Sequence, residues 1–392
     1  MKIAWINSQA TLKGGAETYI HQTSKLLKNS FNTTNILLYE VSSHADYEFT
    51  KNFEFATVIV DLKRQLLELK PDIIYLHQLD NIALLEALQQ SGIPVVAFIH
   101  DHKHFCLREH KYTTIGHKTC TQATGMNCYS CLGFIAKSDG ILPIKINTLS
   151  KINTIQTIYR SFDQCVVASE YMKNHLLLHN FDSKKISKIT LFSDHEKRLL
   201  LKDITKHPQT FLFVGQLVRG KGIDTLLQAF AKMQERSMHL DICGSGVQED
   251  ELKALSQSLG LEERVHFHGY VSGHKLSDFY TNAYAVVIPS RAPETFNLVG
   301  VEAMKYSKAV IATRVGGISE WLQEGITGLS FDSNDVTMLT QKLDHMANNP
   351  SEVQEMGLIA RAQFEKRFSP QEHINTLYQL LTNLSSGANH AF

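Results

Sequence analysis

The 392-residue chain carries 39 basic and 39 acidic residues, so no strong field of one sign favours binding to nucleic acid or to anionic lipid. Its length is sufficient for two or three domains, each with its own core. The opening stretch MKIAWINSQATLKGG has too short an apolar run for a signal peptide, and nowhere are there 18 consecutive apolar residues. These features predict a soluble, cytoplasmic protein.

The first half of the chain alternates short apolar runs with segments of helical spacing. Strands are expected at 2–7, 35–38, 56–60, 72–76, 94–99, 164–168 and 186–191, and helices near 15–27, 61–69, 81–90, 145–160 and from Ser169 onward. Such alternation is typical of a parallel, doubly wound sheet.

Two places in this half are candidate ligand contacts. The GGAE turn at 14–17 precedes a helix, where glycines allow close approach and the helix start favours negative charge, although such turns also serve simple packing. The strand PVVAFIH delivers His100 and Asp101 to its carboxyl end, where open α/β sheets bind ligands. A neutral imidazole there can hydrogen-bond a sugar hydroxyl; the alternative is a histidine that merely caps the strand.

Four of the six cysteines are close together in sequence, with the spacing C-x13-C-x7-C-x2-C at Cys106, Cys120, Cys128 and Cys131. Four thiolates predict a closed, tetrahedral zinc site with a structural role. The zinc could instead be bound in part by histidines of the same segment, namely His102, His104, His110 and His117. Unligated thiols, or a redox pair at Cys128 and Cys131, remain alternatives.

A polar run at 193–209 predicts a linker, after which strand–helix alternation resumes. Strands are expected at 210–214, 239–242, 265–267, 285–288 and 309–312, and helices up to about 233, at 247–258, 334–347, 351–366 and 370–384. Gly316 and Gly317 stand next to another expected helix start. The two halves therefore predict two similar α/β folds.

The turns of the second half carry cations and glycines. In GQLVRGKG at 215–222, Arg219 and Lys221 stand ahead of a helix, which suits a diphosphate, although a solvated basic turn is the alternative. CGSG places Gly244 and Gly246 before a helix, but Glu249 occupies the third position of the dinucleotide fingerprint. This argues against a nicotinamide-dependent oxidoreductase.

The stretch AVVIPSRAPETFNLVGVE at 285–302 organises the second half. It reads as a buried strand, a loop with Glu294, and a helix capped by Asn297 that carries Glu302. The amides of Asn297, Leu298 and Val299 would meet an anion, and the two carboxylates would bind hydroxyl groups on either side of it. A nucleotide-sugar offers this combination, whereas the alternative is two solvated glutamates.

Taken together, these motifs resemble the retaining GT-B glycosyltransferases usually called family 4. The resemblance rests on GGAE, His100, KG at 221–222, GSG at 244–246, HGYV at 268–271, the E-x7-E pair, EAM at 302–304 and VGGISEWL at 315–322. A subgroup of the family also has the HD…C…C…C-x2-C loop.

The resemblance implies two Rossmann-like, doubly wound domains that face each other across a cleft. An acceptor domain with a cysteine-rich loop at 100–131 would occupy 1–195, and a donor domain 196–370. A last helix at 371–392 would cross back to the first domain.

The resemblance also implies roles for single residues. His100, Glu294 and Lys221 would be catalytic, with Glu294 on the donor sugar and Lys221 on the diphosphate. Glu17 and Asp101 would contact the acceptor. The donor would be bound by Gly15, Gln216, Arg219, Gly244, Gly246, Tyr270, Val271, Thr295, Phe296, Asn297, Leu298, Val299 and Glu302.

Two positions depart from the family pattern. Gln216 stands where many members have arginine. One negative charge of the diphosphate would therefore have no cationic partner unless Arg219 takes the place of that arginine. Asn297 replaces a frequent glycine, which would either change the amide geometry or supply the helix cap.

The expected activity is transfer of a hexose, with retention, from a UDP- or GDP-linked sugar to a hydroxyl of a cell-surface glycan or lipid-linked saccharide, as in polysaccharide or lipopolysaccharide biosynthesis. No metal is expected in catalysis, no nucleic acid is expected as a partner, and a lipid-linked acceptor would bring the protein to the inner face of the plasma membrane. A sugar-nucleotide epimerase, or a non-catalytic nucleotide-sugar-binding protein with a metal or redox loop, is the alternative.

Overall fold

The structure is a computed structural model that describes residues 1–12, 14–40, 45–113, 116, 118–137, 144–146, 148–193 and 209–388. The chain forms two compact units, and each is continuous in space although not in sequence. The first comprises Met1–Lys111, Thr121–Thr190 and Pro370–Phe392, and the second comprises Tyr112–Cys120 and Leu191–Ser369. Nearly all of the linker predicted at 193–209, and the rival ligand His117, lie outside the described residues.

The first unit is built on a seven-stranded sheet in which every described pairing is parallel. Its order is β3-β2-β1-β4-β5-β8-β9. The strands are β1 (Lys2–Asn7), β2 (Thr34–Tyr39), β3 (Phe55–Val58), β4 (Ile73–Leu76), β5 (Val95–Phe98), β8 (Gln164–Val167) and β9 (Ile186–Lys188). The order reverses between β1 and β4, which is the topological switch point of a doubly wound fold.

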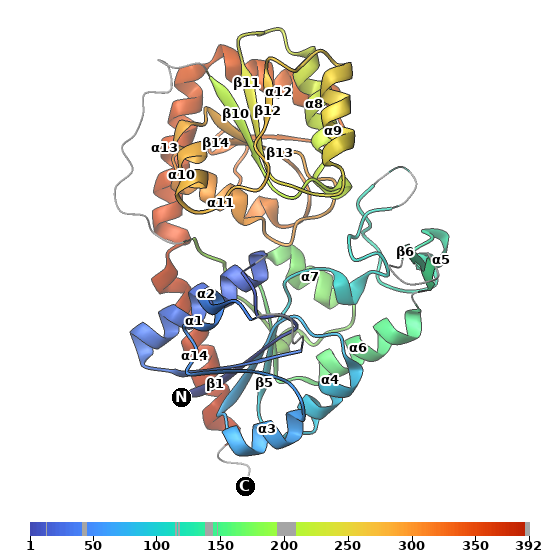
Figure 1. Ribbon diagram of the computed structural model, residues 1–392, viewed down its shortest axis with the longest axis vertical. Helices are drawn as coiled ribbons and strands as arrows, with labels where there is room; N and C mark the ends of the chain where they lie inside the picture. Colours follow the sequence, from blue (N-terminus) through green and yellow to red (C-terminus); the bar gives the residue numbers. More distant parts are fainter. Residues whose placement is uncertain are drawn as a thin grey trace. The chain divides into compact units, whose positions relative to one another are not determined.

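Helices cover both faces of this sheet (Figure 1). The helices of this unit are α1 (Gly15–Phe31), α2 (Tyr47–Thr50), α3 (Leu62–Leu69), α4 (Ile82–Gln89), α6 (Leu149–Ser161), α7 (Glu170–Leu178) and α14 (Pro370–Ala388), with short 3-10 turns η1 (Lys103–Phe105) and η2 (Ser183–Lys185). The four-residue helix α5 (Asn127–Ser130) lies away from the sheet, beside the strand labelled β6 (Figure 1). The last helix packs on α1, where the rings of Phe31 and Tyr378 stack with centroids 4.0 Å apart. The Ser169 side chain caps α7 by accepting from the Met172 amide at 3.1 Å, which confirms the predicted start of that helix.

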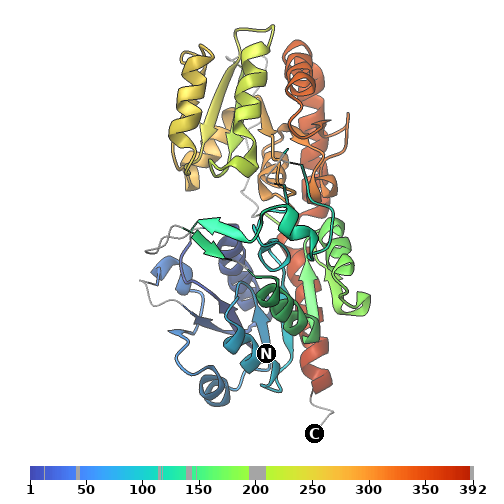
Figure 2. The same ribbon diagram turned by 90° about the vertical axis from the view of Figure 1, so that its right-hand side faces the viewer.

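One predicted helix of this unit begins later than expected. The sequence predicts helix from 145, but Ile144–Ile146 forms β7, which pairs antiparallel with β6 (Ile135–Lys137) in a separate ribbon (Figure 2). Helix α6 starts at Leu149, after Thr148 accepts a hydrogen bond from the Lys151 amide. Thr148, a residue type that favours helix caps, correctly indicates the start of α6, and the alternation Ile-Lys-Ile correctly indicates the strand β7.

The second unit repeats the architecture with a six-stranded sheet in the order β12-β11-β10-β13-β14-β15, again parallel at every described pairing. The strands are β10 (Thr210–Val214), β11 (His239–Cys243), β12 (Val265–Phe267), β13 (Ala285–Ile288), β14 (Ala309–Thr313) and β15 (Gly328–Phe331). Here the order reverses between β10 and β13. Both sheets therefore have the strand order of a Rossmann fold.

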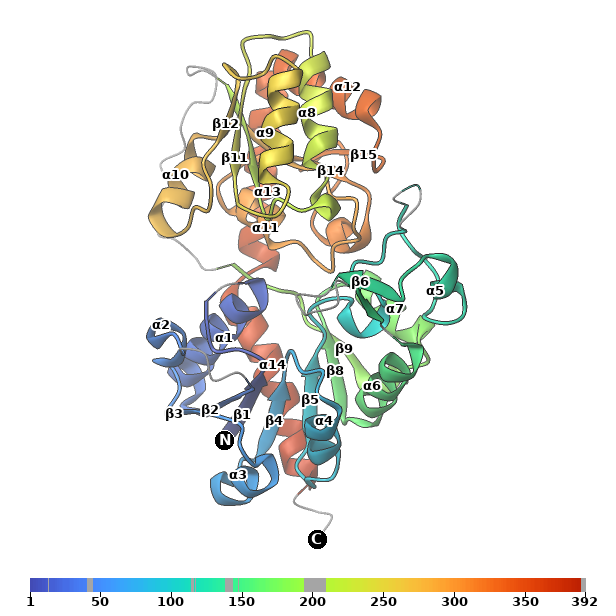
Figure 3. The ribbon, with the colours of Figure 1, turned by 45° about the vertical axis from the view of Figure 1, so that its right-hand side comes forward.

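Helices α8 (Ile223–Lys232), α9 (Glu249–Ser258) and α12 (Val336–Asn348) pack together on one face of this sheet (Figure 3). Helices α11 (Leu298–Lys305) and α13 (Pro350–Arg367) pack together on the other face, and α10 (Gly273–Asn282) contacts β10. The residues predicted to start a helix at Gly316 form only the 3-10 turn η4 (Gly316–Glu320), and η3 (Arg219–Lys221) precedes α8. No helix in the described ranges is long and apolar enough to cross a bilayer.

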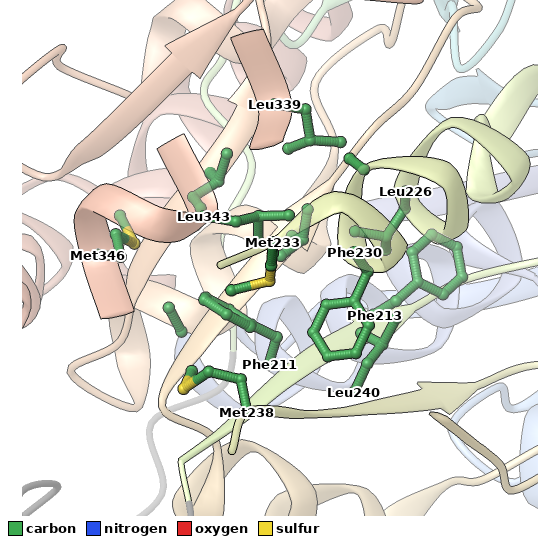
Figure 4. Packing of buried hydrophobic residues seen from close by; sticks show 14 of the residues in the cluster. Phe211, Phe213, Leu226, Phe230, Met233, Met238, Leu240, Leu339, Leu343 and Met346 are labelled. Carbon is green, nitrogen blue, oxygen red and sulfur yellow. The ribbon is translucent and has the colours of Figure 1, made fainter. Parts of the chain in front are cut away.

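The core of the second unit lies between β10 and the pair α8 and α12 (Figure 4). Phe211 and Phe213 alternate along β10, so both point to the same face. Residues four apart on each helix meet them. These residues are Leu226 and Phe230 on α8 and Leu339 and Leu343 on α12, all fully buried. The strand and helix periodicities of the sequence thus specify this layer directly.

Candidate functional site

The two loops that follow β10 and β13 lie at the switch point of the second sheet. The amides of Arg291 and Ala292 donate to the Gly220 carbonyl at 2.8 and 3.0 Å. A Cβ added at Gly222 would stand 2.0 Å from the Pro289 carbonyl oxygen. The loops are therefore held together by backbone contacts, and their side chains share one edge of the sheet.

Lys221 and Glu294 meet at this edge. The Lys221 Nζ donates to the Glu294 Oε1 at 2.7 Å, and the side chains are 30% and 14% exposed. The Ser290 hydroxyl donates to the same carboxylate oxygen. Two residues that are 73 positions apart in the chain are thus brought into direct contact.

The Glu294 carboxylate is held in its ionised form. Burial acts most strongly on it and raises its pKa, but Lys221, Ser290 and Asn297 together outweigh burial, so the pKa lies below its ordinary value. An ionised carboxylate only accepts hydrogen bonds. Glu294 therefore suits recognition of hydroxyl groups and does not suit the role of a general acid.

Gly316 and Gly317 fix the backbone of the Glu294 loop. The Gly317 amide donates to the Glu294 carbonyl at 2.6 Å. Gly316 has φ +62°, and a Cβ there would lie 2.1 Å from the same carbonyl oxygen. The two glycines therefore allow their own loop to approach the Glu294 loop closely.

Asn297 caps helix α11, as predicted. Its side chain accepts from the Gly300 amide at 3.3 Å, and its backbone is left-handed with φ +69°. Glycine and asparagine tolerate this conformation best, which explains why asparagine can replace the glycine of the family pattern. The first amides of α11, beginning at Leu298, have no partner within the helix and are suited to an anion.

Glu302 lies in α11 and accepts a hydrogen bond from the Tyr280 hydroxyl at 2.8 Å. Burial raises the pKa of Glu302, and Tyr280 and Lys305 oppose this only in part. Tyr280 is fully buried on α10. No helix was predicted around Tyr280, although Leu276, Phe279 and Tyr280 have the spacing of an apolar helix face that could have indicated α10.

Gly244 and Gly246 allow two loops of the second unit to pack closely against each other. A Cβ at Gly244 would be 1.8 Å from the Gly215 carbonyl oxygen, and one at Gly246 would be 2.4 Å from that of Leu217. The two glycines let the loop after β11 lie directly on the loop after β10, where the Leu217 amide donates to the Ser245 carbonyl at 2.9 Å.

The remaining predicted donor contacts differ in exposure. Gln216 and Arg219 are exposed, Tyr270 is 73% exposed, and Val271 is 9% exposed. Thr295, Leu298 and Val299 are half-buried. Phe296 is buried, and its carbonyl accepts from the Trp321 indole at 2.8 Å.

In the first unit, the predicted residues lie near its own switch point. Asp101 accepts from the Gln78 amide group at 3.3 Å and from the Lys103 backbone at 2.8 Å. Glu17 is 8% exposed and stands 3.5 Å from the Asn7 amide group. Among the residues that the structure describes, none beyond the chain neighbours of Gly15 comes within 4 Å of a Cβ added there.

His100 follows β5, and its Nε2 lies 2.8 Å from the Nδ1 of His77, a residue that the sequence analysis did not single out.

The four clustered cysteines are half-buried and form no disulfide. Cys120 belongs to the second unit, while Cys106, Cys128 and Cys131 belong to the first. Among the described residues, no three His, Cys, Asp or Glu side chains are placed to share a metal ion. Zinc therefore stays a prediction from the sequence.

Metal analysis of the purified protein tests that prediction. Binding by all four cysteines predicts one zinc per chain, and replacement of Cys128 and Cys131 by serine should release it. Lys342→Ala, a surface substitution in the second unit, is the control and should retain the metal. A wild-type protein without stoichiometric zinc would exclude the site.

Comparison with known proteins identifies the two halves separately. Residues 13–197 match the family model described as Glycosyltransferase Family 4, and residues 201–363 match that of Glycosyl transferases group 1. The chain is 40% identical over 119 residues to an uncharacterized glycosyltransferase of Methanocaldococcus jannaschii, covering 30% of each chain. It is 34% identical over 155 residues to a D-inositol 3-phosphate glycosyltransferase of Arthrobacter, covering 38% of this chain and 37% of the relative.

The chain thus aligns with only about a third of the length of these two curated relatives. The fold comparison extends over the whole protein. The crystal structure of HepE from Anabaena in complex with UDP superposes with a TM-score of 0.76 and 16% identity, covering 98% of this chain and all of that one. With two Rossmann-like units and both family models matched, the chain belongs to the group 1 / family 4 glycosyltransferases of the GT-B fold.

Proposed function

We propose that the protein transfers a hexose from a nucleotide diphosphate sugar to a hydroxyl group of an acceptor, with retention of anomeric configuration. The observation that carries this proposal is the contact between Lys221 and Glu294 at the switch point, beside the capped start of α11. A cation and free amides suit a diphosphate, and the adjoining carboxylate suits the sugar attached to it.

Lys221 can serve both groups at once. Its ammonium has three donors, and only one is used in the contact with Glu294. In the proposed complex, another would bind the diphosphate together with Arg219 and the first amides of α11. Glu294 would accept from sugar hydroxyls and Glu302 from the ribose, with Gln216, Gly244, Gly246, Tyr270, Val271, Thr295 and Phe296 around the nucleotide.

In the reaction, the bond between the anomeric carbon and the diphosphate oxygen breaks, and a bond from that carbon to the acceptor oxygen forms. The acceptor's proton passes to the departing phosphate oxygen, so the charges balance without a protein nucleophile. Lys221 and the α11 amides stabilise the charge on the diphosphate, which is the main source of catalysis in this account and makes a catalytic metal unnecessary. His100 would contact the donor sugar, Gly15 would back the diphosphate, and Glu17 and Asp101 would orient the acceptor.

Named relatives support a sugar-nucleotide donor. HepE was crystallised with UDP and with UDP-glucose, so a uridine donor is the first choice and a guanosine donor the second. We propose a glycan or lipid-linked saccharide as acceptor, and a lipid-linked one would place the protein at the cytoplasmic face of a membrane. The comparisons do not favour an epimerase or a non-catalytic binding protein, because the family models and curated relatives are glycosyltransferases.

A thermal-shift screen with UDP, GDP, ADP and their sugar derivatives tests the donor class. A ligand at a hundred times its Kd should stabilise the native state by about 2.7 kcal/mol, so the matching nucleotide should raise the melting temperature clearly. The Lys221→Ala variant should lose the shift. A protein that responds to none of these nucleotides would contradict the proposal, and an isomerised sugar formed without acceptor would favour the epimerase.

A further inference from the structure

A buried tyrosine contacts one of the two glutamates proposed to bind the donor. Tyr280 lies on α10, and its hydroxyl donates to the Glu302 Oε2 on α11 at 2.8 Å. The Tyr280 side chain is 1% exposed, and its ring stacks on that of Tyr306 with centroids 5.1 Å apart and an interplanar angle of 7°. The packing therefore holds the hydroxyl in a fixed place beside the carboxylate.

Glu302 has acceptor capacity that the protein does not use. An ionised carboxylate has two oxygens with about four lone-pair sites. Tyr280 occupies one site on Oε2, and no other hydroxyl or amide of the described residues donates to this carboxylate. The Glu302 side chain is half-buried, so it is not sealed from solvent. Its second oxygen, Oε1, is thus left for a donor that comes from outside the protein.

The tyrosine alone does not explain a carboxylate at this position. A buried hydroxyl needs an acceptor, but a backbone carbonyl is sufficient, as for Tyr284, whose hydroxyl donates to the Met346 carbonyl. A carboxylate is a more costly partner, because burial disfavours its charge and raises the pKa of Glu302. The cost has a purpose if the second oxygen of Glu302 binds a ligand.

The place of Glu302 along α11 suits the ribose of a nucleotide. It lies four residues after Leu298, the first residue of the helix, which corresponds to about 6 Å along the axis. Helical side chains lean toward the N-terminus, where the first amides await an anion. The span is comparable with that from a 5′-phosphate to the 2′- and 3′-hydroxyls of the same nucleoside. A diphosphate on these amides would bring its ribose to the level of Glu302.

We propose that Tyr280 is a positioning residue that holds the Glu302 Oε2, so that Oε1 is presented to a hydroxyl of the donor's ribose. A glutamate side chain has three rotatable bonds, and a ligand that must order them binds less tightly. Tyr280 orders them in advance. The inference rests on the proposed nucleotide-sugar donor and deepens it, because it gives the two oxygens separate tasks. All of its residues lie in the second unit.

Calorimetric titration with UDP, 2′-deoxy-UDP and 3′-deoxy-UDP tests the proposal. Wild-type protein should bind at least one deoxy analogue about 10-fold or more weakly than UDP, which is the size of one hydrogen bond to a charged group. Tyr280→Phe keeps the ring but lacks the donor. It should lower this ratio of Kd values at least about threefold, because UDP loses more affinity than the analogue. Equal weakening of both ligands would make the role of Tyr280 merely structural and overturn the proposal.

Tyr306→Phe is the matched control. It removes the hydroxyl of the stacked partner ring, which donates to the Ser277 hydroxyl at 2.8 Å and not to Glu302. The Kd ratio should stay within about twofold of wild type. In a Glu302→Ala background, Tyr280→Phe should have no further effect on the ratio, whereas an undiminished effect would mean that Tyr280 acts through another group.

A crystal structure of the wild-type protein with UDP needs no variant. It should show the Tyr280 hydroxyl still on Oε2 of Glu302 and a ribose hydroxyl on Oε1. A Tyr280 hydroxyl that has left Glu302 would overturn the inference. Wild-type protein that binds UDP and both deoxy analogues equally would also overturn it, but would leave the proposed donor class intact. Wild-type protein that binds neither UDP nor GDP would contradict the proposed function itself.

Discussion

Replacement of Lys221 by alanine, or of Glu294 by alanine, is expected to lower turnover by about 100- to 1,000-fold while the fold is retained. Lys221→Ala removes the cation beside the charge that develops on the diphosphate. Glu294→Ala removes the ionised hydrogen-bond acceptor of the sugar hydroxyls, which Lys221, Ser290 and Asn297 keep ionised. Initial rates with saturating donor, together with circular dichroism of each variant, measure both effects.

A matched control lies in the same unit. Lys342 and Glu324 also form an ion pair, with Nζ and Oε1 3.1 Å apart and side chains 27% and 45% exposed. Lys342→Ala removes the same type of cation away from the switch-point loops and should leave turnover within about twofold, since partly exposed pairs contribute little. Near-wild-type rates for Lys221→Ala would remove this residue from the mechanism.

Replacement of Gly244 by alanine is expected to destabilise the second unit strongly, by about 1–3 kcal/mol or more. The added Cβ would lie 1.8 Å from the Gly215 carbonyl oxygen and 2.9 Å from its carbon. Both obstacles are backbone atoms at the end of β10, so relief requires two loops to separate. Because Gly215 and Leu217 begin the loop that leads to Lys221, nucleotide binding should weaken as well.

Fluorescence can follow this unit by itself. The sequence has two tryptophans, Trp5 in the first unit and Trp321 in the second, and both are buried. In a Trp5→Phe background, urea unfolding monitored at Trp321 therefore reports the second unit. Gly387→Ala in helix α14 of the first unit is the control for the glycine-to-alanine change: no described atom lies within 4 Å of its added Cβ, and the Trp321 transition should stay at the midpoint of the Trp5→Phe parent. Equal urea midpoints for the two variants would show that a Cβ at Gly244 does not destabilise the second unit.

The parts of the fold that local signals specify were predicted well. The strand at Lys2–Asn7 has the predicted bounds, and so does the strand at Ala285–Ile288. Both are apolar runs ended by polar or proline residues. The caps at Ser169 and Asn297 were also predictable, because a side chain that bonds its own helix start depends only on residues a few positions away.

Two elements of the second unit were missed for local reasons. Helix α10 (Gly273–Asn282) is short and begins with Gly273, a weak helix former, and only Leu276, Phe279 and Tyr280 give it an apolar face. Strand β15 (Gly328–Phe331) has only four residues and begins with glycine, which weakens its strand signal.

Contacts between distant residues were beyond the sequence analysis. Arg291 is buried, and its guanidinium contacts the Asp224 carboxylate at 2.6 Å and the Arg219 carbonyl at 3.2 Å. It therefore ties the Glu294 loop to the Lys221 turn, yet nothing near Arg291 in the sequence indicates these partners. The same holds for His77 beside His100, since two strands must first pair before these rings meet.

The most direct measurement is a crystal structure of the protein with UDP or UDP-glucose. The account predicts that the diphosphate lies within hydrogen-bond distance of the Lys221 Nζ and of the first amides of α11, with a carboxylate oxygen of Glu294 on a sugar hydroxyl and one of Glu302 on the ribose. A nucleotide bound at any other part of the second unit, with Lys221 still paired only to Glu294, would contradict it.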